Sequence, residues 1–399
     1  MVMFVVLKRY TIIEFLPALP FSYSVIGLSY VLFKLLHLII DVKGGAIERI
    51  PSPTEYFNYM CFFLSFLSGP IQRFQDFEAQ ESASANHQHT RESIQKALQR
   101  IVLGFLKVIL VCGFMARSQY FSDGFLLFVS THSNPLDVVW IVRFASACTL
   151  YTLFLYFNFS GYMDVVIGVG AMFGFNLPEN FQKPFEAKNF LDFWARWHIT
   201  LSDWFRTYLF NPLLKMLVSH CSNKKILPYL GVLAFFVTFT VMGLWHGTNS
   251  VFLVYGVFLG LGISINKLFH VVMQKKNLKQ RYSKFRNNIF VQQCFRGLTF
   301  SYFAVALTCL WTDEKLLSLL GSKMGLFAGC GALIVVWFAA IFLLPTVSYC
   351  RLLVSRLSDN FLCSFGYVAR NISISIQILL ILTGLVVIQN PVVFVYKAF

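Results

Sequence analysis

Two histidines, each preceded by tryptophan, are the residues best suited to acid–base chemistry: His198 and His246. His246 closes a long apolar run between Gly243 and Gly247, where an ionisable side chain is costly unless it has a function. A neutral imidazole, whose ordinary pKa is about 6.5, can take a proton from a hydroxyl group. We therefore expect His246 to be a general base; the alternative is a structural histidine bound to a helix carbonyl. The glycines would permit a turn and a close approach of the backbone to a ligand.

His198 lies in a segment, 178–212, that is too polar to cross a membrane and too aromatic to remain a free loop. On a helical wheel its apolar residues share one face; these are Phe190, Phe193, Trp194, Trp197, Leu201, Trp204, Phe205 and Tyr208. The charged residues on the opposite face are Asp192, Arg196, Asp203 and Arg206. Asp192 and Arg196 are spaced for an ion pair. The pattern predicts an amphipathic helix at the membrane interface, with His198 as either a second functional group or a hydrogen-bonding anchor.

Two further polar positions lie beside apolar stretches. The sequence SGPIQRF places Arg73 directly after an apolar run, and FNFSGYMD places Asp164 between two such runs. A carboxylate beside a membrane span faces water or pairs with a cation, and Arg73 and Arg196 are the candidate partners of Asp164. The residues expected to support catalysis or to bind substrate are Arg73, Asp164, Arg196, Trp197, Trp245 and Asn249.

The composition indicates that membrane helices position these residues. Apolar types (AVILMFWYC) make up 57% of the 399 residues and charged types 13%, against about 25% charged residues in a soluble domain. This composition excludes a soluble, disordered or coiled-coil protein. The excess of 33 Lys and Arg over 18 Asp and Glu fits cytoplasmic loops and anionic lipid headgroups better than nucleic acid.

We predict one all-α integral-membrane domain over residues 1–399, with roughly eight to eleven membrane-embedded elements. The expected spans are 15–40, 54–70, 98–116, 138–158, 160–177, 226–246, 251–270, 296–312, 326–345 and 373–390. The loops 215–225 and 271–290 contain Lys and Arg but no acidic residue, which predicts that both are cytoplasmic. Residues 226–270 would then form a helical hairpin whose tip, next to His246, points away from the cytoplasm.

Other chemistry finds little support in the sequence. The nine cysteines form no CxxC motif, and most lie in apolar runs, so they predict buried thiols rather than disulfides or a metal site. His87 and His89 form an HxH without a third ligand, and we predict no metal. The sequence contains no Walker A, HExxH or GxSxG motif, which argues against nucleotide hydrolysis, zinc proteolysis and an elbow-type serine hydrolase.

Five motifs resemble the membrane-bound O-acyltransferase family, in particular the bacterial branch that acetylates alginate or D-alanylates teichoic acid. They are RWHITLSDWFRTYLF (196–210), GLWHG (243–247), SGPIQRF (68–74), SGYMD (160–164) and PENFQKPF (178–185). The stretch 18–41 is also similar to an early helix of that branch. The resemblance runs in the same order from about residue 15 to residue 270.

The resemblance implies a ring of membrane helices around a central tunnel, in the cytoplasmic (inner) membrane of a bacterium. His246 matches the catalytic histidine of the family, and His198 matches its second conserved position. His246 would activate an acceptor hydroxyl to attack an acyl thioester. His198, with Arg196 or a backbone amide, would orient the acyl group or stabilise negative charge. Acetyl-CoA or an acyl-carrier protein would be the donor, as a co-substrate and not as a tightly bound cofactor.

The implied reaction moves an acyl group from the cytoplasmic side to a hydroxyl of an extracytoplasmic polysaccharide or of a partner protein. Acetyl is the first expectation for this acyl group. The expected partners are membrane lipids, the cytoplasmic donor or carrier and an extracytoplasmic acyltransferase, with no nucleic acid. The alternative within the family is D-alanyl transfer to a cell-envelope polymer. From another class, a transporter or flippase would hold a lipid-linked anionic substrate with Arg73, Lys183 and Arg196, although the sequence lacks an internal repeat. An inactive scaffold is a third possibility.

Overall fold

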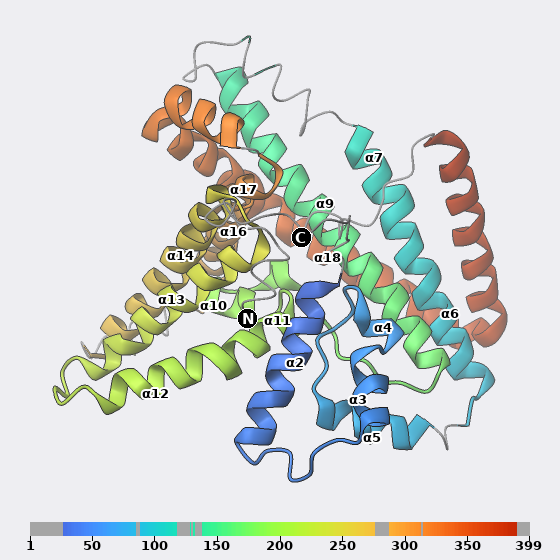
Figure 1. Ribbon diagram of the computed structural model, residues 1–399. Coiled ribbons are helices and arrows are strands. Elements are labelled where there is room, and N and C mark those ends of the chain that lie inside the picture. The colour runs from blue at the N-terminus through green and yellow to red at the C-terminus, as the bar shows by residue number, and fades with distance from the viewer. Residues whose placement is uncertain are drawn as a thin grey trace, which may run out of the picture.

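The computed structural model describes residues 27–84, 88–117, 128, 131, 138–275, 287–312 and 314–388. Throughout these residues the regular elements are helices, apart from one isolated bridge between Phe181 and Trp197. The all-α prediction is therefore confirmed for the described part of the chain. Figure 1 shows that the short helices α10 (Phe190–Trp194) and α11 (Ile199–Phe205) lie near the middle of the molecule, with the longer helices around them.

The elements fall into two groups along the chain, and the second begins within the polar segment that contains His198. The first group is α2 (Leu28–Lys43), α3 (Pro53–Met60), α4 (Phe63–Phe66), α5 (Phe74–Ser84), α6 (Arg91–Leu106), η2 (Lys107–Val111), α7 (Cys112–Arg117) and α9 (Val138–Met172). The later elements are η3 (Pro184–Glu186), α10, α11, η4 (Arg206–Phe210), α12 (Asn211–Ser219), α13 (Leu227–His246), α14 (Ser250–Lys275), α16 (Ile289–Ala306), α17 (Thr308–Trp311) and α18 (Glu314–Val387). The η2 and η4 turns are π-helical and join the α-helices on either side of them.

Seven helical stretches of the described residues are long and apolar enough to cross a membrane. They are Arg91–Ala116, Val138–Met172, Leu227–His246, Ser250–Gln274, Ile289–Trp311, Gly329–Tyr349 and Arg370–Val387. Six of them correspond one to one with expected spans. Both the sequence and the structure thus indicate a multi-pass membrane protein, although with seven candidate spans where we predicted eight to eleven embedded elements. The ring around a central tunnel stays a prediction.

Two expected spans merge into one helix. Residues 138–158 and 160–177 were separated in the prediction, but α9 runs through both as a single helix. Gly161, near the expected break, does not interrupt the helix. It lies where α6 crosses α9, and a Cβ on Gly161 would lie 2.8 Å from the Gly104 carbonyl oxygen. The close packing of two helices that a glycine permits stabilises the protein and so allows a glycine inside a helix.

Another expected span, 54–70, is two short helices instead. Ser52 starts α3 with a reciprocal capping box to Glu55, and the helix ends at Met60. The chain then turns into α4, a single turn of helix. Neither helix is long enough to cross a membrane. Of the expected span 15–40, α2 forms the part from Leu28 onwards, and residues 15–26 lie outside the described part of the chain.

The segment 178–212 is not one amphipathic helix. Its helical course is interrupted at His198, whose φ of 44° lies in the left-handed region. Tertiary hydrogen bonds hold the chain on both sides of this turn: the Gln182 N–H donates to the Arg196 carbonyl at 3.0 Å, and the Ile199 N–H donates to the Asn180 carbonyl at 3.0 Å. Most of the predicted apolar face is nevertheless buried in the core: Phe190, Phe193, Trp194, Trp197, Leu201 and Phe205. The face therefore packs inside the protein and does not lie at the membrane interface.

The hairpin predicted over 226–270 is present as α13 and α14. Their backbones come into contact at two glycines, since a Cβ on Gly243 would lie 2.2 Å from the Cα of Gly256. Gly247 follows the last residue of α13, and a Cβ there would lie 1.9 Å from the ring of Phe252. These glycines thus make room for the neighbouring helix, where we had expected room for a ligand.

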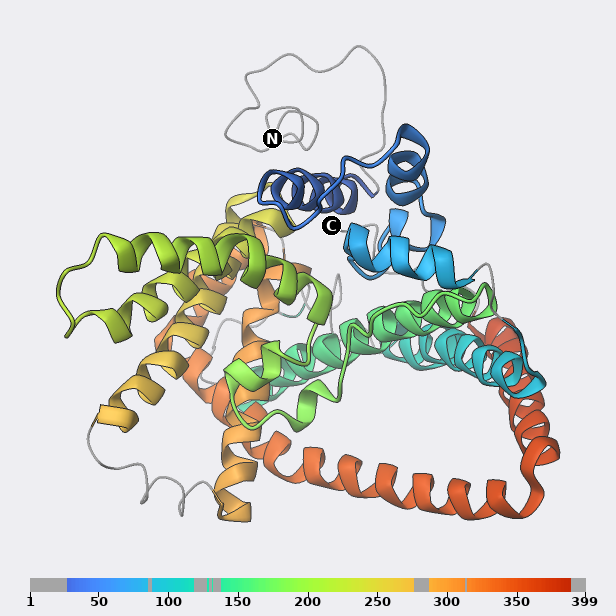
Figure 2. The same ribbon diagram turned by 90° about the horizontal axis from the view of Figure 1, so that it is seen from below.

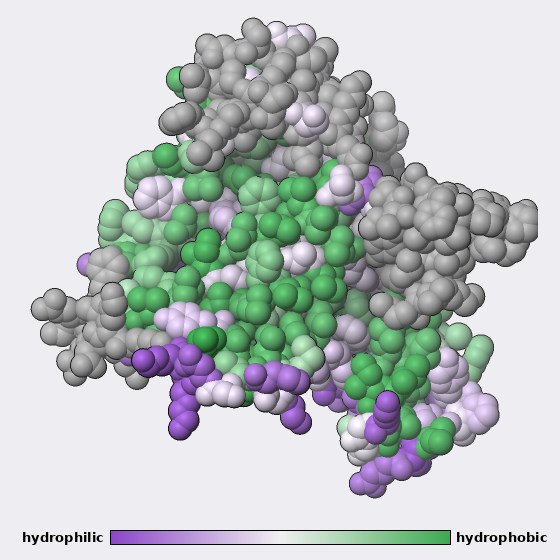
Figure 3. Space-filling view, turned by 60° about the vertical axis from the view of Figure 1, so that its left-hand side comes forward, coloured by the Kyte–Doolittle hydropathy of each residue, from purple (hydrophilic) through white to green (hydrophobic). Residues whose placement is uncertain are grey.

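Large apolar side chains are exposed along the candidate spans. On α14 they include Leu253, Phe258 and Ile265. Figure 3 shows a broad apolar surface with hydrophilic residues along its lower edge, as expected for contact with lipid. The long helix α18 contains two candidate spans, and Figure 2 shows it running along one edge of the molecule before it turns back towards α6.

Candidate active site

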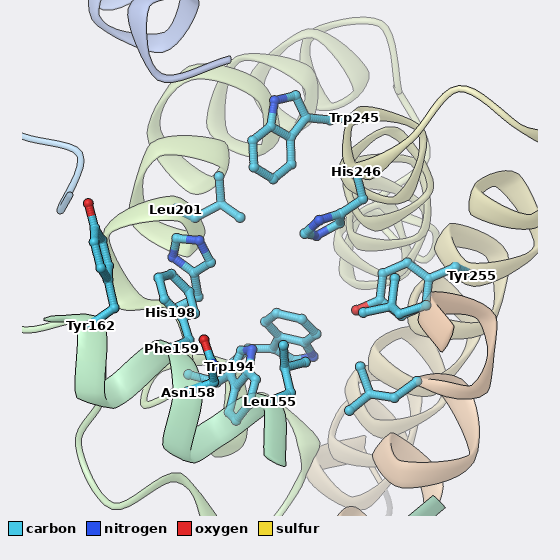
Figure 4. Close-up of a pocket in the computed structure, with 13 residues that line it drawn as sticks. Leu155, Asn158, Phe159, Tyr162, Trp194, His198, Leu201, Trp245, His246 and Tyr255 are labelled. Atoms are coloured by element: carbon cyan, nitrogen blue, oxygen red, sulfur yellow. The ribbon is translucent and has the colours of Figure 1, made fainter. Parts of the chain in front are cut away.

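His198 and His246 line the same cavity, although 48 residues separate them in the sequence. The walls come from α9, the α10–α11 turn, α13, α14 and α17, and Figure 4 shows both imidazole rings directed into the cavity. The volume is about 40 Å³, which is room for a few water molecules. Most of the remaining lining is apolar or aromatic, so hydrogen bonds and partial charges inside the cavity act strongly.

The hairpin holds His246 from both of its helices. His246 is the last residue of α13, and the centroid of the adjacent Trp245 ring lies 4.7 Å from that of the imidazole. Tyr255 of α14 packs against the imidazole in a T-shaped arrangement, with 5.5 Å between the ring centroids. Both aromatic residues also line the cavity. His246 therefore lies at the end of a candidate span, as predicted, with its ring orientation restricted by two aromatic neighbours.

His198 occupies the turn between α10 and α11, outside the seven candidate spans, and is only 5% exposed. The ring of Phe159 packs against it in a T-shaped arrangement with 4.8 Å between centroids. Burial disfavours the charged imidazolium and lowers the pKa of His198 to about 3, so the ring is neutral at physiological pH. Within the described residues, its Nδ1 atom has no hydrogen-bond partner. A neutral ring with an unused nitrogen is suited to hydrogen bonding with a bound substrate.

Of the expected supporting residues, Trp197 and Trp245 line the cavity. Asn249 does not; it is exposed in the turn before α14. Arg196 is also absent from the lining, because its Nε donates to the Oδ1 of Asp192 at 2.8 Å. The i,i+4 ion pair of Asp192 and Arg196 is therefore confirmed, and it holds the guanidinium outside the cavity.

Asp164 and Arg73 lie outside the cavity lining as well. Arg73 donates to the hydroxyl of Thr207 at 3.2 Å. Asp164 instead accepts from two cations of the neighbouring helix, Arg100 (Nε to Oδ1, 3.1 Å) and Lys107 (Nζ to Oδ2, 2.5 Å). Asp164 is therefore paired with cations, one of the two expected alternatives, but neither expected partner, Arg73 or Arg196, is among them. The partners come from the crossing of α6 and α9, which the sequence motifs do not reveal.

Several cavity residues were not among the expected site residues. Asn158 and Tyr162 line the cavity from α9 and are one helical turn apart, so the motif FNFSGYMD contributes these two residues where we had selected Asp164. Trp194 lines the cavity from α10, and its Nε1 has no hydrogen-bond partner in the described part of the chain. The available signal for Trp194 was its position on the apolar face, one turn before His198.

Metal ligation has no candidate among the residues that the structure describes, because no three His, Cys, Asp or Glu side chains gather there. His89 lies in the short stretch before α6 and is exposed, whereas His87 is outside the described residues. The chemistry available at the cavity is therefore that of two imidazoles, the indole N–H groups of its tryptophans and the polar groups of α9 and Tyr255.

Comparison with known proteins assigns the chain to a family. Residues 27–312 match the membrane-bound O-acyltransferase family, MBOAT. The "Teichoic acid D-alanyltransferase" of Streptococcus thermophilus is 30% identical over 73% of this chain and 70% of its own length, and that of Bacillus subtilis is 30% identical over 59% and 57%. The "Probable alginate O-acetylase AlgI" of Pseudomonas syringae pv. tomato is 31% identical over 61% of this chain, but the match spans only 42% of that protein. The chain therefore belongs to the membrane-bound O-acyltransferase family and is a multi-pass membrane enzyme.

Proposed function

We propose that this enzyme transfers an acyl group, most simply acetyl, from a thioester on the cytoplasmic side of a bacterial inner membrane to a hydroxyl group on the opposite side. The acceptor is an extracytoplasmic polysaccharide or a partner protein that passes the acyl group on. The observation that carries the proposal is the meeting of His198 and His246 in one cavity of an O-acyltransferase. The alginate O-acetylases among its relatives support acetyl as the acyl group.

His246 acts as the general base. Its imidazole accepts the proton of the acceptor hydroxyl while the hydroxyl oxygen attacks the carbonyl carbon of the thioester. The C–S bond of the tetrahedral intermediate then breaks, and the departing thiolate takes the proton back from the imidazolium. One ester forms, one thiol leaves, and His246 returns to its neutral state. The contacts with Trp245 and Tyr255 keep the ring in position for both proton transfers.

His198 stabilises the negative charge on the carbonyl oxygen. Because its ring is neutral, one ring nitrogen carries an N–H that can donate a hydrogen bond to an oxyanion. The Nε1–H of Trp194 supplies a second donor from the same wall of the cavity. Trp194 thus takes the place that the sequence suggested for Arg196, whose guanidinium is paired with Asp192.

The donor reaches the cavity from the cytoplasmic side, which the basic loop residues Lys215, Lys224 and Lys225 mark by the positive-inside rule. Acetyl-CoA and an acyl-carrier protein are both thioesters with an acidic remainder that basic loops attract. Neither is a resident cofactor in this scheme. An extracytoplasmic acyltransferase completes the transfer where the acceptor of this enzyme is a protein.

D-alanyl transfer to a cell-envelope polymer is the second candidate. It is favoured by one observation: the streptococcal D-alanyltransferase matches a larger share of this chain, and of its own length, than the alginate acetylase does. The chemistry at His246 would be the same, because a D-alanyl thioester differs only in its acyl group. A lipid transporter is less well supported, since two of its expected cations, Arg73 and Arg196, are engaged by neighbouring side chains away from the cavity.

The gene for this protein is deleted in the native host, and the deleted strain is complemented with one variant at a time. The amount of acid ester-linked to the cell-envelope polysaccharide is then measured. Cells carry wild type, His246→Ala, His198→Ala or His89→Ala, with membrane levels matched by immunoblot. Loss of a general base predicts a decrease of at least about 10²-fold for His246→Ala. The exposed His89 lies outside the cavity, so His89→Ala is expected to match wild type. Mild alkaline release identifies the acid as acetate or D-alanine, and full ester in both cavity variants would refute the proposal.

A further inference from the structure

Helix α11 begins in an unusual way at His198. The first backbone N–H groups of a helix have no partner within it, and a Ser, Thr, Asp or Asn side chain at the preceding position normally accepts from them. His198 occupies that position, makes no side-chain hydrogen bond to the helix, and has a φ of 44°. A left-handed conformation at a residue other than glycine persists only where surrounding contacts impose it.

The missing cap is supplied by Asn180, from a different part of the chain. Its backbone carbonyl accepts from the N–H of Ile199 at 3.0 Å. Its side-chain Oδ1 accepts from the N–H of Thr200 at 3.1 Å and from the Thr200 hydroxyl at 2.7 Å. Asn180 is fully buried, with 0% of its surface exposed. The first two N–H groups of α11 are therefore both bonded to one residue that precedes His198 by 18 positions.

The contacts of Asn180 extend to two further segments. The Thr200 hydroxyl accepts from the N–H of Ile71 at 3.1 Å, and Asn180 Nδ2 donates to the sulfur of Met163 at 3.1 Å. The segments 68–74, 160–164, 178–185 and 196–210, which the sequence analysis identified as separate motifs, meet at this point.

We propose that Asn180 is a positioning residue for the reaction: it caps α11 in place of His198 and so leaves the His198 imidazole in the cavity. A histidine that capped its own helix would turn a ring nitrogen towards the backbone N–H groups. Because Asn180 caps the helix from another segment, it holds the left-handed turn, and the His198 ring is not drawn to these N–H groups. The inference rests on the proposed function, because it acts through His198 as the stabiliser of the oxyanion.

Asn180→Ala and Asn180→Asp form the first pair of test variants. Asp keeps the acceptor oxygen for Thr200 but buries a carboxylate and loses the donor to Met163, so Asn180→Asp is expected to retain more ester transfer than Asn180→Ala, though less than wild type. Asn180→Ala lets the His198 ring shift, and a misplacement of about 1 Å lowers the rate on the order of 10²-fold. Asn288→Ala is the matched control, because the Asn288 side chain likewise caps a helix, accepting from two backbone N–H groups at the start of α16, and does not line the cavity.

Thr200 provides a second and gentler pair. Thr200→Val has nearly the same shape but deletes the hydroxyl that links Ile71 to Asn180, whereas Thr200→Ser keeps it. Thr200→Val removes both hydrogen bonds of the hydroxyl and is expected to lower transfer at least about fivefold, whereas Thr200→Ser is expected to stay close to wild type. This pair decides the question if Asn180→Ala fails to reach the membrane. Equal activity of the two Thr200 variants would overturn the proposal.

A double-mutant cycle separates positioning from general destabilisation. The rate of incorporation of labelled acetate or D-alanine into envelope ester is measured for Asn180→Ala, His198→Ala and the combination, at matched membrane levels. If Asn180 acts through His198, adding Asn180→Ala to His198→Ala changes the residual rate by no more than about twofold. Multiplicative losses, or full activity of Asn180→Ala, would overturn the inference while leaving His198 in its role. Full activity of His198→Ala would instead show that the proposed function of His198 has failed.

Discussion

The close contact between α13 and α14 predicts that even a small side chain at Gly243 disturbs the protein. A Cβ at this position would lie 2.2 Å from the Cα and 2.4 Å from the nitrogen of Gly256, and also 2.8 Å from the Phe252 carbonyl oxygen. All three are backbone atoms, so no side chain can rotate away to make room. Ordinary van der Waals contact begins at 3.4 Å. Gly243→Ala must therefore move the two helices apart by about 1.2 Å at their crossing.

His246 follows Gly243 by three residues on the same helix, so this displacement reaches the proposed general base. Overpacking of this kind costs about 1–3 kcal/mol in stability, which a folded membrane protein can tolerate. A shift of about 1 Å at a catalytic group costs on the order of 10²-fold in rate. We expect Gly243→Ala to reach the membrane at near-normal levels and to lose most ester transfer.

Gly231→Ala is the matched control, because it makes the same change in the same helix. A Cβ at Gly231 would meet only the Cε of Lys267, at 3.6 Å. Alanine is favoured over glycine inside a helix by about 1 kcal/mol, so this variant is expected to keep full activity with an equal or higher melting temperature. Envelope ester and thermal unfolding in detergent are measured for both variants. Full ester transfer by Gly243→Ala would refute the reasoning from backbone contact.

Two further predictions concern charge. The pKa of His198 is lowered from 6.5 to about 3 on folding, so the unfolded chain binds a proton below pH 6.5 that the folded protein does not. The contribution of His198 to the free energy of unfolding is therefore present above pH 6.5 and falls by about 1.4 kcal/mol between pH 8 and pH 5.5. Thermal unfolding of His198→Asn should lack this part of the pH dependence, and identical slopes would contradict it. Asp164→Asn leaves Arg100 and Lys107 without their shared carboxylate and is expected to cost about 2 kcal/mol, whereas Asp203→Asn breaks an exposed pair and costs less than about 1 kcal/mol. Equal shifts in melting temperature for the two aspartates would refute this difference.

The parts of the structure that depend on local pattern could be predicted from the sequence. Residues 226–270 contain two apolar runs of membrane length between basic loops, and they form the expected hairpin. His246 could be recognised because an ionisable group at the end of such a run is rare. The pattern also grouped the apolar residues around Trp197 on one face, but it placed that face at the membrane interface, whereas most of it is buried in the core.

The parts that depend on distant contacts could not be predicted in this way. A helical wheel over 178–212 assumes a continuous helix, but the chain turns at His198, where Asn180 and Gln182 bond to the residues on either side, and no local pattern encodes those contacts. Asp164 needed a cation, and the choice of Lys107 depends on where α6 crosses α9. The convergence of His198 and His246 is likewise a tertiary result, since the spacing of 48 residues fixes no distance between them.

The small volume of the cavity has a consequence for the fate of the acyl group. Water is itself a nucleophile, and a base that activates a hydroxyl group also activates water. A space of about 40 Å³ with mostly apolar walls admits only a few water molecules at a time, and exclusion of water suppresses hydrolysis of a reactive acyl group. In the proposed reaction, the geometry that brings His198 and His246 together thus favours delivery of the acyl group to its acceptor over its loss to solvent.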